Sequence, residues 1–264
     1  LSGWDGDTDI NGGGDCDDTD GQTGSADLHF LDADGDVYGD TWHDIAPSAY
    51  GICALSLNGH LECSGDDSLG QSSGAPSSDG FTQVVGGVQH YCALHSTGSI
   101  DCWGDDTNSQ VSDTPVGTHW ASLDAGEYHT CALATDGSAT CWGHTSDSSL
   151  DPTSTPSAQF VKLSSGYGVS CGQTDVGAIE CWGGDSNLAS VPTGDGYSSL
   201  SVGTDFACVL NSAGEVSCWG SDTTLISSTP TTDQNQQVIA KHQAVCIVRD
   251  TNEVYCWSSH FLTP

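Results

Sequence analysis

The chain has 264 residues, with 36 acidic side chains against three basic ones and a formal net charge of −33 at pH 7. A surface this negative repels phosphate backbones, so nucleic acid is not an expected partner. No apolar run approaches the roughly 18 residues that a transmembrane helix needs, so no membrane span is expected.

The cysteines and the first residue both point to export. The chain has 13 cysteines and no methionine, and it begins at Leu1. We therefore expect a processed product whose signal peptide has been removed. So many cysteines are typical of an oxidising compartment. The sequence predicts a secreted or cell-surface protein.

Residues 1–41 are rich in Asp and poor in large apolar residues, so composition alone predicts disorder. Alternate side chains of a tight loop converge on one cation, however, and the first aspartates match the D-x-[DN]-x-[DN]-G start of a calcium loop. The expected ligands are Asp7, Asp9, Asn11, the Gly13 carbonyl, Asp15 and Asp18. Asp18 stands where the pattern has a bidentate Glu, which lowers the expected affinity. We predict an arm without regular structure that binds Ca²⁺.

A second Asp-rich run shows the same alternation. Its expected ligands are Asp32, Asp34, Asp36, the Tyr38 carbonyl and Asp40. It departs from the pattern at Val37, where the sharp turn favours Gly, and at His43, the last ligand position. Both runs resemble the calcium-binding segments of thrombospondin type 3 and dockerin repeats, which implies Ca²⁺ as a cofactor. The alternatives are a solvated acidic linker and an adaptation of the surface to salty water.

Cys16 has no partner at the spacing that the other cysteines share. The carboxylates of Asp15, Asp17 and Asp18 disfavour a reactive thiolate there, so a catalytic role is not expected. In an exported protein an unpaired cysteine predicts a bond to another chain. A thiol shielded beside the calcium loop is the alternative.

The other twelve cysteines form six pairs whose members are ten positions apart: Cys53/Cys63, Cys92/Cys102, Cys131/Cys141, Cys171/Cys181, Cys208/Cys218 and Cys246/Cys256. Six residues after each first cysteine stands Gly59, Gly98, Gly137, Gly177, Gly214 or Asn252. These types tolerate the positive φ that a three-residue hairpin loop requires. Each unit is therefore predicted to be a β-hairpin with its cysteines opposite each other and joined by a disulfide. Zinc binding is the alternative, but zinc ligands are usually spaced by two to four residues.

Residues 42–264 repeat with a period of 37–40 residues. Each unit opens with a short alternating segment, such as WASLDA at 120, and continues with the cysteine hairpin and a polar loop. Three short strands cannot bury both faces of a sheet, so neighbouring units must stack. We predict an all-β fold, a β-propeller of six short blades. The last unit ends soon after its hairpin, so a seventh blade would need the N-terminal segment or a neighbouring chain.

Two repeats carry a family resemblance. Gly87–Gly104 and Gly126–Gly143 both match G-x-x-H-x-C-A-L-x-x-x-G-x-x-x-C-W-G. This pattern resembles the regulator of chromosome condensation repeat, in the disulfide-containing form of exported bacterial proteins. The resemblance implies a propeller, usually of seven blades, and a binding role without a defined partner. The chain departs from the pattern at Ser64, which replaces Trp, and at Lys241, which replaces the early Gly.

Several side chains invite a chemical interpretation. The tryptophans after the second cysteines are predicted to pack between blades: Trp103, Trp142, Trp182, Trp219 and Trp257. His90 and His129 are predicted to be structural, although a two-histidine metal site is the alternative. Gly70–Gly74 matches the G-x-S-x-G nucleophile motif, but a loop between strands lacks the strand-to-helix turn that the motif requires. For acid–base catalysis at the channel mouth, the candidates are Asp105, Asp147 and Asp185.

These features together predict an exported, calcium-binding structural or adhesive protein that is not an enzyme. We expect a subunit of a cell-surface or extracellular filament or layer, whose arm mediates self-association or contact with another surface protein. The first alternative is a monomeric propeller that binds a protein or a glycan through polar loops on one face. The second is a glycan-active enzyme.

Overall fold

The computed structural model describes residues 42–143, 153–183, 188, 191–231 and 234–258. These residues form six three-stranded antiparallel sheets and one short helix, α1 (Thr223–Ser227). The predicted all-β fold is therefore confirmed. No helix in this described part of the chain is long and apolar enough to cross a membrane.

Each sheet is one blade, and its strands occur in chain order as inner, middle and outer strand. Blades 1 and 2 contain β1 (Trp42–Pro47), β2 (Gly51–Ser56), β3 (Leu61–Gly65), β4 (Phe81–Gly86), β5 (His90–His95) and β6 (Ile100–Gly104). Blades 3 and 4 contain β7 (Trp120–Ala125), β8 (His129–Ala134), β9 (Ala139–Gly143), β10 (Lys162–Ser165), β11 (Val169–Gln173) and β12 (Ile179–Gly183). Blades 5 and 6 contain β13 (Ser199–Val202), β14 (Phe206–Leu210), β15 (Val216–Gly220), β16 (Asn235–Lys241), β17 (Ala244–Arg249) and β18 (Val254–Ser258).

The cysteine hairpins are the middle and outer strands of the blades. The six turn residues after the first cysteines all have positive φ, from 63° at Asn252 to 86° at Gly137, as predicted. The cysteines of each pair face each other in register, with Cα atoms 4.0–4.1 Å apart. Each hairpin is thus closed by a covalent bond at its centre.

All six predicted disulfides are present: Cys53–Cys63, Cys92–Cys102, Cys131–Cys141, Cys171–Cys181, Cys208–Cys218 and Cys246–Cys256. Zinc needs a free thiolate as its ligand, so the zinc alternative is wrong for these twelve cysteines. The second cysteine is less deeply buried than the first in most pairs, because it lies on the outer strand. Those that are only half-buried, and that pack against the edge of the interblade core, are Cys63, Cys102, Cys181 and Cys218.

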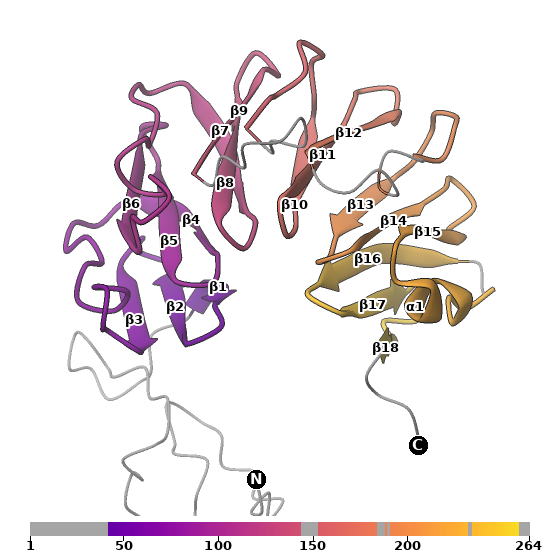
Figure 1. Ribbon diagram of the computed structural model, residues 1–264, viewed down its shortest axis with the longest axis horizontal. Coiled ribbons are helices and arrows are strands. Elements are labelled where there is room, and N and C mark those ends of the chain that lie inside the picture. Colours follow the sequence, from indigo (N-terminus) through magenta and orange to yellow (C-terminus); the bar gives the residue numbers. More distant parts are fainter. Residues whose placement is uncertain (1–41, 144–152, 184–187, 189–190, 232–233, 259–264) are drawn as a thin grey trace, which may run out of the picture.

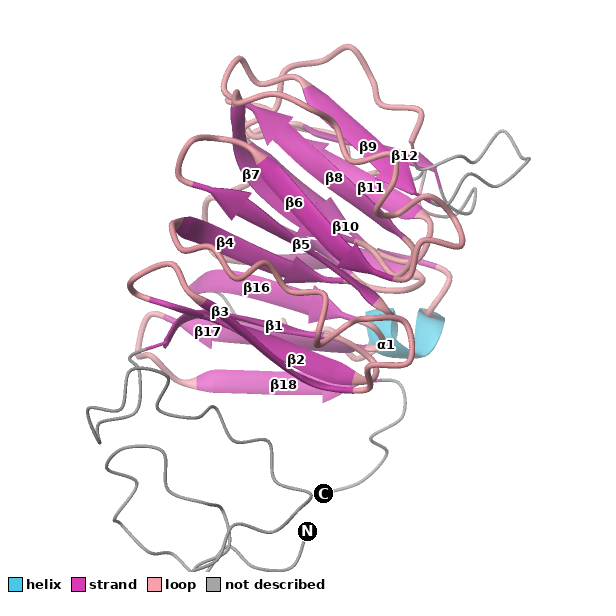
Figure 2. Ribbon diagram, turned by 90° about the vertical axis from the view of Figure 1, so that its left-hand side faces the viewer, coloured by secondary structure: helices cyan, strands magenta, loops and turns pink. Residues whose placement is uncertain are grey.

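The six blades follow one another around an arc (Figure 1), and the sheets of blades 1 to 3 stack on one another in the side view (Figure 2). The inner strands of all six blades line a central cavity of about 330 Å³. Close packing joins each blade to the next, but within the described residues none joins β16–β18 to β1–β3. We call the space between these two sheets the open end.

The core lies between blades rather than within them. One face of each blade carries the disulfide (the cystine face), and the other carries the tryptophan or its equivalent (the tryptophan face). The cystine face of blade 1, with Cys53, Leu55 and Leu61, packs on Phe81 and Trp103 of the next blade. The same arrangement recurs around the arc, and all five tryptophans are buried, as predicted.

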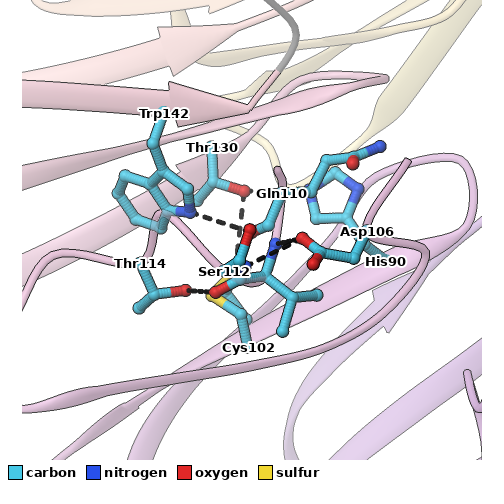
Figure 3. The surroundings of a disulfide bond; sticks show 10 residues. His90, Cys102, Asp106, Gln110, Ser112, Thr114, Thr130 and Trp142 are labelled. Atoms are coloured by element: carbon cyan, nitrogen blue, oxygen red, sulfur yellow. Dashed lines mark hydrogen bonds between the residues drawn. A yellow bond between two sulfur atoms is a disulfide. The ribbon is translucent and has the colours of Figure 1, made fainter. Parts of the chain in front are cut away.

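The loops that leave the outer strands supply hydrogen-bond partners for these tryptophans. The Trp142 indole N–H donates to the Gln110 carbonyl at 2.9 Å (Figure 3). The loop is held in shape by Asp106, whose carboxylate accepts the backbone N–H groups of Val111 and Ser112 at 2.9 and 2.8 Å. Polar loops between blades therefore complete the burial of an aromatic core residue.

Candidate interaction surface

The inner strands can be compared position by position, because each is part of a six-residue segment that starts with an aromatic residue or its equivalent. These segments begin at Trp42, Phe81, Trp120, Phe160, Tyr197 and Asn235. Position 4 is apolar in every segment, and in blades 2 to 6 it is only 1–7% exposed, at Val84, Leu123, Leu163, Leu200 and Val238. In blade 1 the same position is Ile45, which is 53% exposed. The tryptophan face of blade 1 therefore lacks the partner that every other blade has.

The cystine face of blade 6 is exposed in the same way. Val254 of β18 is 64% exposed, whereas its equivalents Leu61 and Ile100 are 4% and 8% exposed. Ile239, at position 5 of the inner segment, is 46% exposed. Cys246 and Cys256 also reach the surface, although the first cysteine of every other pair is fully buried. The open end thus lies between a tryptophan face and a cystine face, the two kinds of surface that pack together at each closed junction.

Polar side chains tie each inner strand to the next, and sequence reasoning did not find them. Gln83, at position 3 of blade 2, donates to the Leu123 carbonyl at 2.9 Å and accepts the Leu123 N–H at 2.8 Å. Asp44 accepts the Val84 N–H at 3.3 Å in the preceding junction. Similar side-chain to backbone bonds are made by Asp124, Ser164, Ser199 and Ser201. These bonds substitute for the ladder that separate sheets cannot form.

Blade 6 carries the same kind of residue with nothing to bind. Gln237 occupies position 3 of β16, the place of Gln83 in β4. It is exposed, and its side-chain amide forms no hydrogen bond with any residue that the structure describes. The open end therefore offers an unused amide beside an exposed apolar surface, the combination that holds a strand at the closed junctions.

One of the three basic side chains of the protein, Lys241, lines the central cavity. The Lys241 ammonium crosses it from blade 6 and donates to the Ala125 carbonyl of blade 3 at 2.8 Å. Burial raises the pKa of Asp124, while Lys241 and Lys162 act in the opposite direction. Burial lowers the pKa of Lys162, opposed by the nearby Asp124. The Lys241–Ala125 hydrogen bond joins blade 6 to blade 3 across the cavity, and the two lysines offset part of the cost of burying the Asp124 carboxylate.

One mouth of the cavity carries a polar cluster with tyrosines around it. The Glu127 carboxylate accepts the Thr204 hydroxyl at 2.9 Å and lies 3.5 Å from the His242 Nδ1. Tyr128 and Tyr167 meet edge to face, with ring centroids 5.8 Å apart. Tyr167 is 51% exposed. This mouth therefore places exposed aromatic surface beside a carboxylate.

The two predicted structural histidines have that role. His90 is completely buried, and its Nε2 is 2.9 Å from the Thr130 hydroxyl of the next blade. His129 makes the same contact with Ser170 at 2.8 Å. Burial lowers the pKa of His90 to about 4. No group of three or more His, Cys, Asp or Glu side chains in the described part of the chain is arranged to hold a metal ion.

The candidate catalytic residues fall into two groups. Within Gly70–Gly74, the backbone N–H groups of Ser72 and Ser73 donate to Asp67 in a loop between strands, so the nucleophile motif lacks its structural context, as predicted. Asp105 is buried, and it accepts hydrogen bonds from Thr107 at 2.8 and 3.0 Å. Asp147 and Asp185 lie outside the described residues.

The predicted calcium ligands and Cys16 also lie outside the described residues, which start at Trp42. The calcium site, the state of Cys16 and the thrombospondin- and dockerin-like character of residues 1–41 therefore stay predictions.

Comparison with known proteins supports the repeat and the fold. Residues 81–110 and 120–148 match the regulator of chromosome condensation (RCC1) repeat. No curated protein matches the sequence. Among solved structures, the CRINKLY WD40 ectodomain of the Arabidopsis thaliana receptor kinase ACR4 superposes with a TM-score of 0.72 and 23% identity over 85% of this chain and 83% of that one.

Two further structures show the same fold. The entire ectodomain of the Physcomitrella patens receptor kinase CR4 gives a TM-score of 0.72 with 24% identity over 85% of this chain, which spans 66% of the ectodomain. Human WBSCR16 gives a TM-score of 0.66 with 14% identity over 88% of this chain and 78% of that one. Identities this low establish the architecture alone. Two segments of the chain therefore match the RCC1 repeat, and the described residues form a β-propeller.

Proposed function

We propose that this protein is an exported structural or adhesive subunit, and not an enzyme, that is joined to its neighbour through the open end of its propeller. The observation that carries the proposal is the exposure of Ile45, at a position that the five other blades bury. The six disulfides support an oxidising, extracellular location.

The open end favours a β-segment as the inserted element. The open end has the cystine face of blade 6 on one side and the tryptophan face of blade 1 on the other. A β-segment inserted between them would pack one of its faces on each. Apolar contacts come from Ile45, Ile239 and Val254, and a backbone anchor comes from Gln237. Exposed apolar side chains that gather at one place on a soluble protein mark interaction sites.

Light scattering on the full chain over a range of concentrations tests this proposal. We expect association in the wild type and a loss of association in Ile239→Asp, because a carboxylate in the junction would be desolvated without a partner. Val116→Asp is the matched control, since Val116 is 92% exposed in the loop before β7. A wild type that stays monomeric at every concentration contradicts the proposal.

Calcium and Cys16 enter the same proposal through the N-terminal arm. We propose that Ca²⁺ bound by residues 1–41 orders the arm, so excess chelator is expected to disperse the assembly. Cys16 is expected to give dimers that a reductant separates on a denaturing gel. An assembly that is unchanged in excess chelator would contradict the role of calcium. Monomers on a non-reducing denaturing gel would contradict a disulfide between chains at Cys16.

A second candidate function is glycan binding at the tyrosine-rimmed mouth of the cavity. It is favoured by the exposed Tyr167 ring beside Tyr128 and the Glu127 carboxylate. Sugar rings stack on such aromatic faces, and carboxylates accept their hydroxyl groups. Tyr167→Ala should abolish binding to any glycan that a glycan array identifies, whereas Val116→Asp should not. The absence of any ligand on the array argues against this function.

A further inference from the structure

We propose that the open end binds residues 28–33 of this chain as an added inner strand between β16 and β1. The inference rests on the proposed function, because it takes the open end to be the binding surface and names its occupant. The segment belongs to the 41 residues that precede β1, outside the described part of the chain.

The sequence of this segment has the pattern of an inner strand. Leu28–Ala33 reads LHFLDA, and the segment Trp120–Ala125 in blade 3 reads WASLDA. Both have a large apolar residue at position 1 and share Leu, Asp and Ala at positions 4 to 6. Leu31 therefore corresponds to Leu123, which is 4% exposed in its junction. A segment with this pattern has the side chains that a closed junction buries.

Blade 6 provides the matching anchor on one side. At the closed junction the Gln83 amide binds both the N–H and the carbonyl of Leu123, the residue at position 4 of the next strand. Gln237 stands at the position of Gln83, so it would bind the backbone of Leu31 in the same way. The added strand would also cover Ile239, which is 46% exposed.

Blade 1 requires only apolar contact on the other side. At the closed junctions a polar side chain at position 3 or 5 accepts a backbone N–H of the next inner strand. In β1, however, the Ile45 N–H already donates to Asp44 at 3.0 Å, and Pro47 has no N–H to offer. Phe30 is apolar at position 3 of the segment, and it would lie against Ile45. Asp32, at position 5, would find no N–H at Pro47. Its side chain would instead face the central cavity, which the position-5 residues of the described segments line.

The chain is long enough for its own segment to reach the site. Residues 34–41 connect Ala33 to Trp42, and eight extended residues span at most about 28 Å. An inner strand of six residues is about 20 Å long, so an extended connection can return along the added strand to the start of β1. Residues 34–41 cannot be extended and also form a tight calcium loop, so in this arrangement the calcium that orders the arm is bound by the first loop, Asp7 to Asp18. A neighbouring copy can donate the same segment, which gives an assembly.

Amide hydrogen exchange on the full chain tests the occupant. We expect the amides of residues 28–33 to exchange at least about tenfold more slowly in the wild type than in Ile239→Asp or Gln237→Ala. Val116→Asp should leave them protected, because that side chain is remote from the junction. Exchange of these amides at unprotected rates in the wild type, or protection unchanged by Ile239→Asp, overturns the proposal.

A reciprocal variant and a mass measurement complete the test. At the closed junction the equivalents of Leu31 and Val254, Leu123 and Ile100, belong to one buried cluster. Leu31→Asp should therefore speed exchange in Val254–Ser258, and an unchanged rate overturns the proposal. If the protein is monomeric while residues 28–33 are protected, the occupant is correct and self-association is not. If it associates without such protection, self-association stands and this inference fails.

Discussion

The junction between blades 2 and 3 and the open end between blades 6 and 1 use the same positions of the repeat with opposite results. At the closed junction Leu123 is buried, and Gln83 holds the next strand by two hydrogen bonds. At the open end Ile45 and Ile239 are about half exposed, and Gln237 is unused. The comparison shows that the repeat encodes a junction rather than a closed ring. A chain of repeats therefore has two unlike faces left over, as the ends of other repeat arrays do.

The largest difference in the free energy of unfolding is expected when the apolar side chain at position 4 of an inner segment is truncated. Leu123→Ala should lower the free energy of unfolding by about 2–5 kcal/mol, because it leaves a cavity in a buried junction. Ile45→Ala should cost less than about 2 kcal/mol if the open end is empty, since half of that side chain is then in water. The loss should be larger if Phe30 of the added strand covers Ile45. Denaturant unfolding monitored by tryptophan fluorescence measures both. Equal losses would mean that the open end is filled as tightly as the closed junctions.

An acid-sensitive group is present at a closed junction and missing from the open one. His90 lies between blades 2 and 3, whereas Ala244 occupies the equivalent position in blade 6. Its pKa is about 4 in the folded protein, below the ordinary 6.5, so the unfolded state binds more protons between these pH values. The contribution of His90 to the free energy of unfolding is therefore fully present above pH 6.5. It falls by up to about 3 kcal/mol as the pH drops to 4.

His90→Gln should remove this part of the pH dependence, which unfolding measured between pH 7 and pH 4 will show. A slope that is the same in His90→Gln and in the wild type would mean that His90 is protonated without cost to the junction.

Local patterns in the sequence predicted much of the fold. The constant spacing of Cys131 and Cys141 and the turn glycine between them fix a hairpin, because register and loop type are decided within a dozen residues. The identical tryptophan position in five repeats likewise predicted interblade packing. Such features need no knowledge of how the blades are arranged in space.

The interaction surface was not predictable in the same way. The links between inner strands use Asp, Gln and Ser at positions 3 and 5, so they form no single motif. Lys241 reaches Ala125 across 116 positions of sequence, which only the curvature of the arc brings together. Whether the blades close into a ring depends on the angle between neighbouring sheets. That angle cannot be predicted from the identity of any single residue.

Hydrogen bonding at position 3 gives the next test of the comparison. Gln83→Ala should cost about 1–3 kcal/mol, because the N–H and the carbonyl of Leu123 lose their partners in a buried junction. If the open end is empty, Gln237→Ala should change the stability by no more than about 0.5 kcal/mol, because Gln237 is exposed and has no hydrogen bond to another described residue. If residues 28–33 occupy the open end, the loss should instead approach that of Gln83→Ala. Thermal unfolding of the two variants beside the wild type measures the contrast. A loss at Gln237 as large as that at Gln83 would show that the amide already holds a strand.

The smallest effect concerns the accessibility of the disulfides rather than stability. Cys131 and Cys141 are 0% and 8% exposed at a closed junction, whereas the Cys246–Cys256 disulfide reaches the surface at the open end. Thiol–disulfide exchange requires access of the attacking thiolate to sulfur, so mild reductant should open Cys246–Cys256 first.

Alkylation followed by mass spectrometry of the peptides identifies the order. Ile239→Asp should speed the opening of Cys246–Cys256 further, because it removes whatever covers the face, and it should leave Cys131–Cys141 unchanged. Simultaneous opening of all six disulfides would mean that reduction follows global unfolding, and that the open end is no more accessible than the junctions inside the arc.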